Sequence, residues 1–456
     1  MAGLTKDLLL QRLRGGEPLS FGHQVRLTSS LCLPAIIAQF STVAMQLIDT
    51  AMVGHLSTDA GAAVGLVSTC IWLLGGFCFA LCNGFSVQVA HLVGANDFAS
   101  ARGVVRQALS SALIWSLAIA LLALCIARPL PYWLGGTGEV AAQASTYFLV
   151  TVLFLPFMQL DFMAATILQC SGNMQIPSVL NVLMCVLDVG FNYLFIWVLD
   201  LGVVGAALGT GLAEVVTGSL MVGYLFFRSK ELRLAGEKGS FAPTSQVVGT
   251  AVKISLPMCL ENIVMRGAYI AGTVIVAPLG AVAVAANNFA VSAESFCYMP
   301  GYGLADASTS LVGQSIGAGR KDMARRFAWI TTGGGMLLMT FTGMLLFFFA
   351  PELMGLISDD PEVVALGASV LRIEAFAETM YAASIVAYGA CVGAGDTLFP
   401  SILNFSSIWI FRIIPAMFLC PKYGLVGYWA AMCFELNMRG LLFLIYLWRA
   451  RWLRAN

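Results

Sequence analysis

Ionisable side chains stand inside long apolar runs of this sequence, where a charge costs about 2.5–3.5 kcal/mol to insert and usually serves a function. Acids outnumber bases among them, so we expect this interior to attract cations. The set is Asp49, Asp161, Asp188 and Glu214 in the first half of the chain and Glu261, Arg266, Glu294, Glu374, Glu378, Arg412, Glu435 and Arg439 in the second.

Helical spacing groups several of these side chains. Asp188 and Asn192 are four residues apart and would share one helix face. Glu374, Glu378 and Tyr381 follow at intervals of four and three and would line another. A buried carboxyl group can hold a proton or balance a bound cation, but gains nothing from holding both. This mutual exclusion is the physical basis of antiport.

Other acids have a structural explanation that is as good or better. Glu435 and Arg439 are also four residues apart, and an ion pair is the expected role for them. Asp161 and Glu214 are as readily structural as functional.

Composition excludes several classes of protein. The chain has 456 residues, of which 59% are hydrophobic and 11% charged, against about a quarter charged in soluble domains. Its net charge is zero and it has no basic tail, so we do not expect it to bind nucleic acid. It has twelve Cys without a CxxC pair and three His without HExxH, which argues against a disulfide scaffold or a zinc site. No nucleophile and base are paired, so neither an enzyme nor a cofactor is expected.

Twelve apolar segments are each about long enough to cross a bilayer, which takes about 20 residues. They predict an all-α polytopic membrane protein with twelve transmembrane helices. The segments are 29–54, 62–88, 106–127, 145–168, 177–199, 203–227, 251–277, 283–308, 327–350, 366–391, 399–421 and 424–447.

Loop charges predict that both termini are cytoplasmic, because Lys and Arg accumulate on the side that is not translocated. With the N-terminus inside, eighteen of them face the cytoplasm, whereas the outer loops hold only Arg128 and Lys422.

The chain repeats itself at a shift of 223 residues. Each repeat holds six helices, so the halves share one orientation and are related by a pseudo-two-fold axis along the membrane normal. We predict an N-terminal lobe over 1–227, a cytoplasmic linker over 228–250 and a C-terminal lobe over 251–456. Two such lobes are typical of transporters that work by alternating access. The matches include Leu33-Pro34 with Leu256-Pro257, Gly94-Ala95 with Gly317-Ala318, and 177–181 with 400–404.

The buried carboxylates do not follow this repeat. A carboxylate that only braced the fold should more often occur in both halves, so we expect a functional role for these acids. At the shift of 223, the matched pairs are Asp49 and Gly272, Asp188 and Phe411, Glu261 and Ala38, Glu294 and Ile71, and Glu378 and Leu155.

Several motifs together resemble the multidrug and toxic compound extrusion (MATE) transporters over nearly the whole chain. They are 48–54 (IDTAMVG) in the first helix, 311–314 (LVGQ) with Gly317-Ala318 after the eighth, 393–397 (GAGDT) after the tenth, and Arg412 in the eleventh. The resemblance implies an exporter that exchanges organic cations for protons or sodium ions. We expect a monomer in the plasma membrane, with a bacterial inner membrane as the setting, in contact with membrane lipids.

The resemblance also implies site residues. Asp49 matches the family's first-helix acid. In the family its companions are an Asn and an Asp four residues apart in the fifth helix and a Thr in the sixth. Here the order of the pair is reversed, since Asp188 precedes Asn192, and Thr210 keeps the expected place. In the C-terminal lobe the acids stand at other positions than in many relatives. Glu261 lies one helical turn before the position of the family's seventh-helix Glu. Tyr381 stands where the family commonly has an acid in the tenth helix, with Glu378 three residues before it. We assign ion coupling to Asp49, Asp188, Asn192 and Thr210, and cation or substrate binding to Glu261, Glu294, Glu374, Glu378 and Tyr381. No metal beyond a coupling sodium ion is expected.

Two alternatives use other chemistry. A flippase for a lipid-linked precursor could share the scaffold, but its anionic head group would favour a cationic cavity, and the excess of acids argues against it. The second alternative is a membrane-embedded enzyme or receptor. The repeat would have no function in such a protein, which argues against this alternative.

Overall fold

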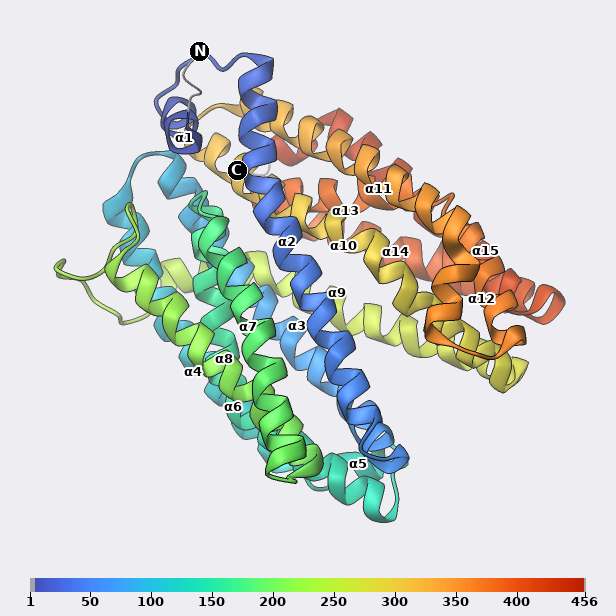
Figure 1. The fold of residues 1–456 in the computed structure, drawn as a ribbon. Helices are drawn as coiled ribbons and strands as arrows, with labels where there is room; N and C mark the ends of the chain where they lie inside the picture. Colours follow the sequence, from blue (N-terminus) through green and yellow to red (C-terminus); the bar gives the residue numbers. More distant parts are fainter. Residues whose placement is uncertain (1–4, 455–456) are drawn as a thin grey trace. The chain divides into compact units, whose positions relative to one another are not determined.

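The chain folds almost entirely into helices (Figure 1). A computed structural model describes residues 5–454, and every regular element in that range is helical. Nine helical stretches of the described residues are long and apolar enough to cross a membrane. The chain is therefore a multi-pass membrane protein of the all-α class.

The predicted segments lie almost wholly in helices, although the tenth is broken at 375–377. Three segments account for the difference between the nine helical stretches and the twelve predicted ones. The stretch Leu398–Arg449 contains both the eleventh and the twelfth segments. It is interrupted at Gly424, whose φ of 61° is a conformation that favours glycine. The eighth segment lies in a more polar helix, and the tenth is divided between two shorter ones.

Contacts between residues divide the chain into two compact units. Unit 1 comprises the described residues up to Gln39 together with those from Leu260 onwards, and unit 2 comprises Phe40–Cys259. Helices α2 (Phe21–Gly54) and α9 (Ser245–Val276) each contribute to both units. The lobes 1–227 and 251–456 with the linker 228–250 follow from the repeat and stay a prediction.

Unit 2 is built around α6, which packs along α3, α4 and α8. Its buried core residues, such as Phe85, Met163 and Met221, come from these helices. Besides the parts of α2 and α9, its elements are α3 (Thr58–Gly94), α4 (Phe98–Ile126), α5 (Leu130–Trp133), α6 (Gly138–Cys170), α7 (Gln175–Tyr193), the π-helical turn η1 (Leu194–Val198) and α8 (Gly202–Phe227).

Unit 1 is built around α10, which packs along α11 and α13. Besides the parts of α2 and α9, its elements are α1 (Lys6–Arg14), η2 (Ala277–Leu279), α10 (Ala281–Gly317), α11 (Lys321–Ile357), α12 (Pro361–Glu374), α13 (Glu378–Gly393), α14 (Leu398–Ser407), the π-helical turn η3 (Ile408–Ile413), α15 (Ile414–Arg449) and η4 (Arg451–Arg454).

The prediction of one continuous helix over 366–391 is wrong. Helix α12 ends at Glu374 and α13 begins at Glu378. Between them, the N–H of Ala377 donates to the carbonyl of Glu374, a spacing of three residues instead of the α-helical four. Gly343 of α11 packs against this break, since a Cβ there would lie 3.0 Å from Cβ of Glu378.

Candidate functional site

In unit 2 the structure joins two acids through one amide. Nδ2 of Asn192 donates to Oδ1 of Asp49 over 2.8 Å and to Oδ2 of Asp188 over 3.2 Å. Asp188 is 0% exposed and Asn192 is 1% exposed. We call these three residues the Asp–Asn–Asp cluster, and the predicted grouping of Asp49 with α7 has direct geometric support.

Local helix geometry positions this cluster. The four-residue spacing places Asp188 and Asn192 on one face of α7. Helix α8 approaches that face at Gly209, where any Cβ would collide with Oδ1 of Asn192. Thr210 follows on α8 and is half-buried. Among the described residues, its hydroxyl forms no hydrogen bond with the cluster, so the structure places Thr210 nearby without joining it.

The cluster has unused acceptors. Oδ1 of Asp188 and Oδ1 of Asn192 are buried without a hydrogen-bond partner, and buried polar atoms normally have one. Oxygen atoms are the ligands that hard cations prefer, and a carboxyl oxygen can equally take a proton. The arrangement can therefore hold a proton or a small cation.

In unit 1 three glutamates converge. One carboxylate oxygen each of Glu294 on α10, Glu374 on α12 and Glu378 on α13 lies within 4.8 Å of the others. All three residues are buried, and the four carboxylate oxygens of Glu374 and Glu378 have no hydrogen-bond partner. We call them the three-glutamate cluster; its donor set could hold a cation.

The route by which Glu374 and Glu378 meet differs from the prediction. Their four-residue spacing was expected to act through one continuous helix, but they lie on either side of the break between α12 and α13. Glu378 instead occupies the first turn of α13, where the helix dipole stabilises negative charge.

Tyr381 belongs to an aromatic group beside this break. Its ring centroid lies 5.6 Å from that of Tyr298 on α10. The guanidinium carbon of Arg439 lies 5.5 Å from the centre of the Tyr381 ring, within the range of a cation–π interaction. The structure thus places Tyr381 next to a cation of the protein itself.

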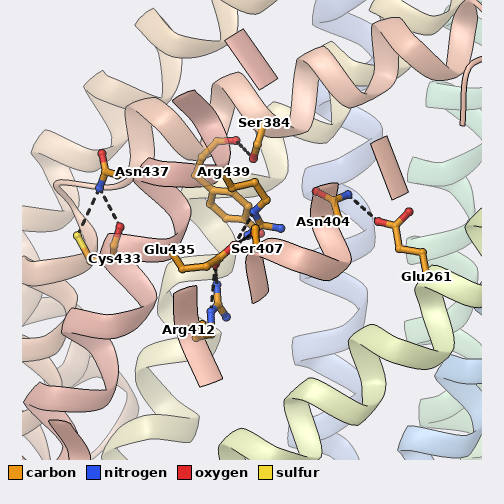
Figure 2. Close-up of polar contacts among 10 residues, drawn as sticks. Glu261, Ser384, Asn404, Ser407, Arg412, Cys433, Glu435, Asn437 and Arg439 are labelled. Carbon is orange, nitrogen blue, oxygen red and sulfur yellow. Dashed lines mark hydrogen bonds and ion pairs between the residues drawn. The ribbon is translucent and has the colours of Figure 1, made fainter. Parts of the chain in front are cut away.

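Glu261 is held by residues outside the three-glutamate cluster. Its carboxylate accepts hydrogen bonds from the hydroxyl of Tyr388 over 2.8 Å, the hydroxyl of Ser401 over 2.6 Å and the amide of Asn404 over 2.6 Å. Figure 2 shows the contact with Asn404. Ser401 and Asn404 lie in the repeated motif at 400–404, whereas the acid that they bind has no counterpart in the other half.

The expected ion pair between Glu435 and Arg439 is confirmed, and a second arginine joins it (Figure 2). Nε of Arg439 lies 3.0 Å from Oε1 of Glu435, and Nη2 of Arg412 lies 2.7 Å from Oε2. The hydroxyl of Ser407 also donates to this carboxylate. Arg412, a residue of the recognised motifs, is therefore part of a buried ionic network.

Sequence reasoning missed Asp306. It lies inside α10 and within the predicted segment 283–308. Its Oδ2 accepts a hydrogen bond from Nε2 of Gln39 over 3.2 Å. The repeat carried a signal, because Asn83, also polar, stands 223 residues earlier.

Comparison with known proteins places this geometry in a family. The family model MatE matches residues 34–194 and 257–418, and the two matches begin 223 residues apart, which confirms the repeat. The chain is 26% identical to the probable multidrug resistance protein NorM of Thermotoga maritima, with 92% of each chain covered. It is 27% identical to the multidrug resistance protein MdtK of Yersinia pestis, with 95% of this chain and 96% of the relative covered.

Solved structures show the same fold. A multidrug resistance MATE family transporter in an outward-facing conformation superimposes with a TM-score of 0.91 at 21% identity, over 98% of this chain and 99% of the other. A MOP superfamily transporter from Pyrococcus furiosus superimposes with a TM-score of 0.89 at 20% identity, over the same shares of the two chains. The chain belongs to the MatE family and is a membrane transporter, not an enzyme.

Proposed function

We propose that this protein exports organic cations in exchange for protons or sodium ions that move inward, by alternating access. Its named relatives are multidrug resistance proteins, which supports drugs and dyes as substrates. We further propose that it works without a cofactor, as a monomer in a bacterial inner membrane, with both termini in the cytoplasm.

The observation that carries this proposal is the state of the buried acids. Both units hold carboxyl groups with open oxygens, in the Asp–Asn–Asp cluster and the three-glutamate cluster. In the described part of the chain, no arginine or lysine forms an ion pair with Asp49, Asp188, Glu261 or Glu378, whereas Glu435 binds two arginines. Acids without a cationic partner can exchange protons and cations.

Energetics supports ion coupling. The membrane potential opposes the exit of a cation by about 2.3 kcal/mol per charge per 100 mV. This corresponds to about a 50-fold concentration ratio for a monovalent cation. An ion that moves inward down its own gradient must therefore offset the cost.

The contacts of the arginines bear on the flippase alternative. An anionic head group needs free cationic side chains, but Arg412 and Arg439 already share the carboxylate of Glu435. The remaining buried acids favour a cationic substrate.

Transport by the purified full-length protein in proteoliposomes tests the proposal. We expect a cationic dye to be exported when a proton gradient or a sodium gradient is imposed alone, which identifies the ion. The double variant Asp49→Asn, Asp188→Asn should lose this export. The exposed Asp59→Asn provides a matched control.

Undiminished export by the double variant would contradict the coupling assignment. Translocation of a labelled lipid-linked precursor in place of the dye would support the flippase.

A further inference from the structure

We propose that Glu214 on α8 and Asp161 on α6 extend the Asp–Asn–Asp cluster into a file of carboxyl groups that conducts protons through the interior of unit 2. This inference rests on the proposed ion-coupled export and adds these two residues to the ion pathway. It commits to protons as the ion that moves along the file.

The first observation is the geometry of α8. Its Gly209 packs on Asn192, and its Gly218 packs on Asp161, since a Cβ at Gly218 would lie 3.2 Å from Cβ of Asp161. The two glycines are nine residues apart, or about 13.5 Å along the helix axis. Glu214 stands between them, five residues after the first and four before the second. Along the axis of α8, Glu214 thus lies about 7.5 Å from the level of Asn192 and about 6 Å from the level of Asp161.

The second observation is the charge around Glu214. It interacts electrostatically with both Asp161 and Asp188. The other titratable groups facing it are the thiol of Cys78 on α3 and the hydroxyl of Tyr147 on α6. Within residues 5–454, no Lys, Arg or His forms an ion pair with either Glu214 or Asp161. These acids therefore lack the partner that a structural carboxylate such as Glu435 has.

The third observation is a set of buried acceptors that lack donors. Oδ1 of Asp161 has no hydrogen-bond partner, and the residue is buried, with 5% of its surface exposed. Oδ1 of Asn192 is also without a partner and lies where α8 passes at Gly209. A buried acceptor of this kind normally binds a proton donor or an ordered water. Water between the carboxyl groups would complete a path of hydrogen bonds.

The file also has a direction. With both termini cytoplasmic, Asp49 lies five residues before the outer end of α2, and Asp161 lies nine residues, about 13.5 Å, before the cytoplasmic end of α6. Asp188 and Glu214 fall between these levels. The repeat places Ser384 and Asn437 at the positions of Asp161 and Glu214, so unit 1 lacks the corresponding acids.

Two transport assays separate conduction from structural support. Net proton movement is followed with a pH-sensitive dye sealed inside proteoliposomes while substrate is exported. Exchange of labelled for unlabelled substrate is measured at equal pH, because exchange needs no net proton movement. The variants are Asp161→Asn and Glu214→Gln, with the conservative Asp161→Glu and with Glu139→Gln, an exposed acid of α6, as the control.

We expect Asp161→Asn and Glu214→Gln each to lower proton movement at least tenfold while substrate exchange stays within twofold of the wild-type rate. Asp161→Glu should restore much of the proton movement. Normal proton movement in both variants would overturn the file, and so would an equal loss of proton movement and exchange, which indicates a structural role. Export driven by sodium alone would overturn it too, and absence of export by the wild-type protein would overturn the proposed function as well.

Discussion

Arg412 and Glu435 form an ion pair of 2.7 Å in the interior of unit 1, with side-chain exposures of 7% and 0%. Arg439 binds the same carboxylate from one helical turn away. Two guanidinium groups therefore depend on one carboxylate, and this network is structural. Its contrast with the unpaired acids nearby separates the residues that support unit 1 from those that are available for transport.

Glu435→Gln should be strongly destabilising, because it leaves two buried guanidinium groups without a counterion. Breaking a buried pair typically costs about 3–5 kcal/mol. Adding Arg412→Met should recover part of the loss, since it removes one of the stranded charges. Thermal unfolding of the purified protein measures both effects, and a double variant less stable than Glu435→Gln alone would contradict this account.

Gly209→Ala should impair transport by displacing Asn192 from Asp49. The new methyl group would collide with Oδ1 of Asn192, and overpacking of this kind costs about 1–3 kcal/mol. Gly223→Ala on the same helix has open space and is the control. Dye export and thermal stability should both fall in the first variant only. Equal export by the two variants would show that the contact between Asn192 and Asp49 is dispensable.

Glu374→Gln should stabilise the protein at alkaline pH while reducing export. The substitution removes one of three like charges that converge within 4.8 Å, and like charges at that distance repel each other. The exposed Glu362→Gln of α12 tests whether any loss of an acid has the same effect. A lower melting temperature for Glu374→Gln at pH 8 would mean that the cluster holds a stabilising bound cation.

Asp396→Asn should flatten the dependence of stability on pH. Asp396 lies in the turn between α13 and α14 and accepts a hydrogen bond from Tyr446. Burial raises the pKa of this carboxyl above its ordinary value, so the folded protein binds the proton more tightly than the unfolded chain does. The stability from this group is complete below the ordinary pKa and is lost as pH rises through the raised pKa.

Melting temperatures measured between pH 4 and pH 8 check this expectation. The wild-type protein should lose more stability than Asp396→Asn over that interval, since asparagine cannot ionise. Parallel curves would remove Asp396 from the explanation. Asp97→Asn, at the exposed start of α4, is a suitable comparison, because the hydrogen bond from Ser100 lowers the pKa of Asp97.

Much of the fold follows from local patterns in the sequence. Apolar length located the helices, apart from the break inside the tenth segment. The repeat agrees with the two matches of the family model. Four-residue spacing correctly paired Glu435 with Arg439 and brought Asp188 next to Asn192. These features depend on neighbours along one helix, whose geometry is the same in every protein.

The rest depends on contacts between distant segments. The break after Glu374 falls in a sequence, Ala375-Phe376-Ala377, that contains neither Gly nor Pro. Helix propensity gives no warning there, and the packing of Gly343 from α11 accompanies the break. The donors to Glu261 lie 127–143 residues away. A carboxylate's partners at such separations cannot be derived from its own helix.

The sharing of α2 and α9 between the two units limits how the chain can be divided. Residues up to Gln39 complete unit 1, and residues 245–259 at the start of α9 complete unit 2. Two polypeptides produced by a cut between α8 and α9 would each lack a piece of the unit that they mainly form. Neither fragment should then fold stably when it is produced alone. When the two fragments are produced together, each should supply the piece that the other lacks, and both should fold.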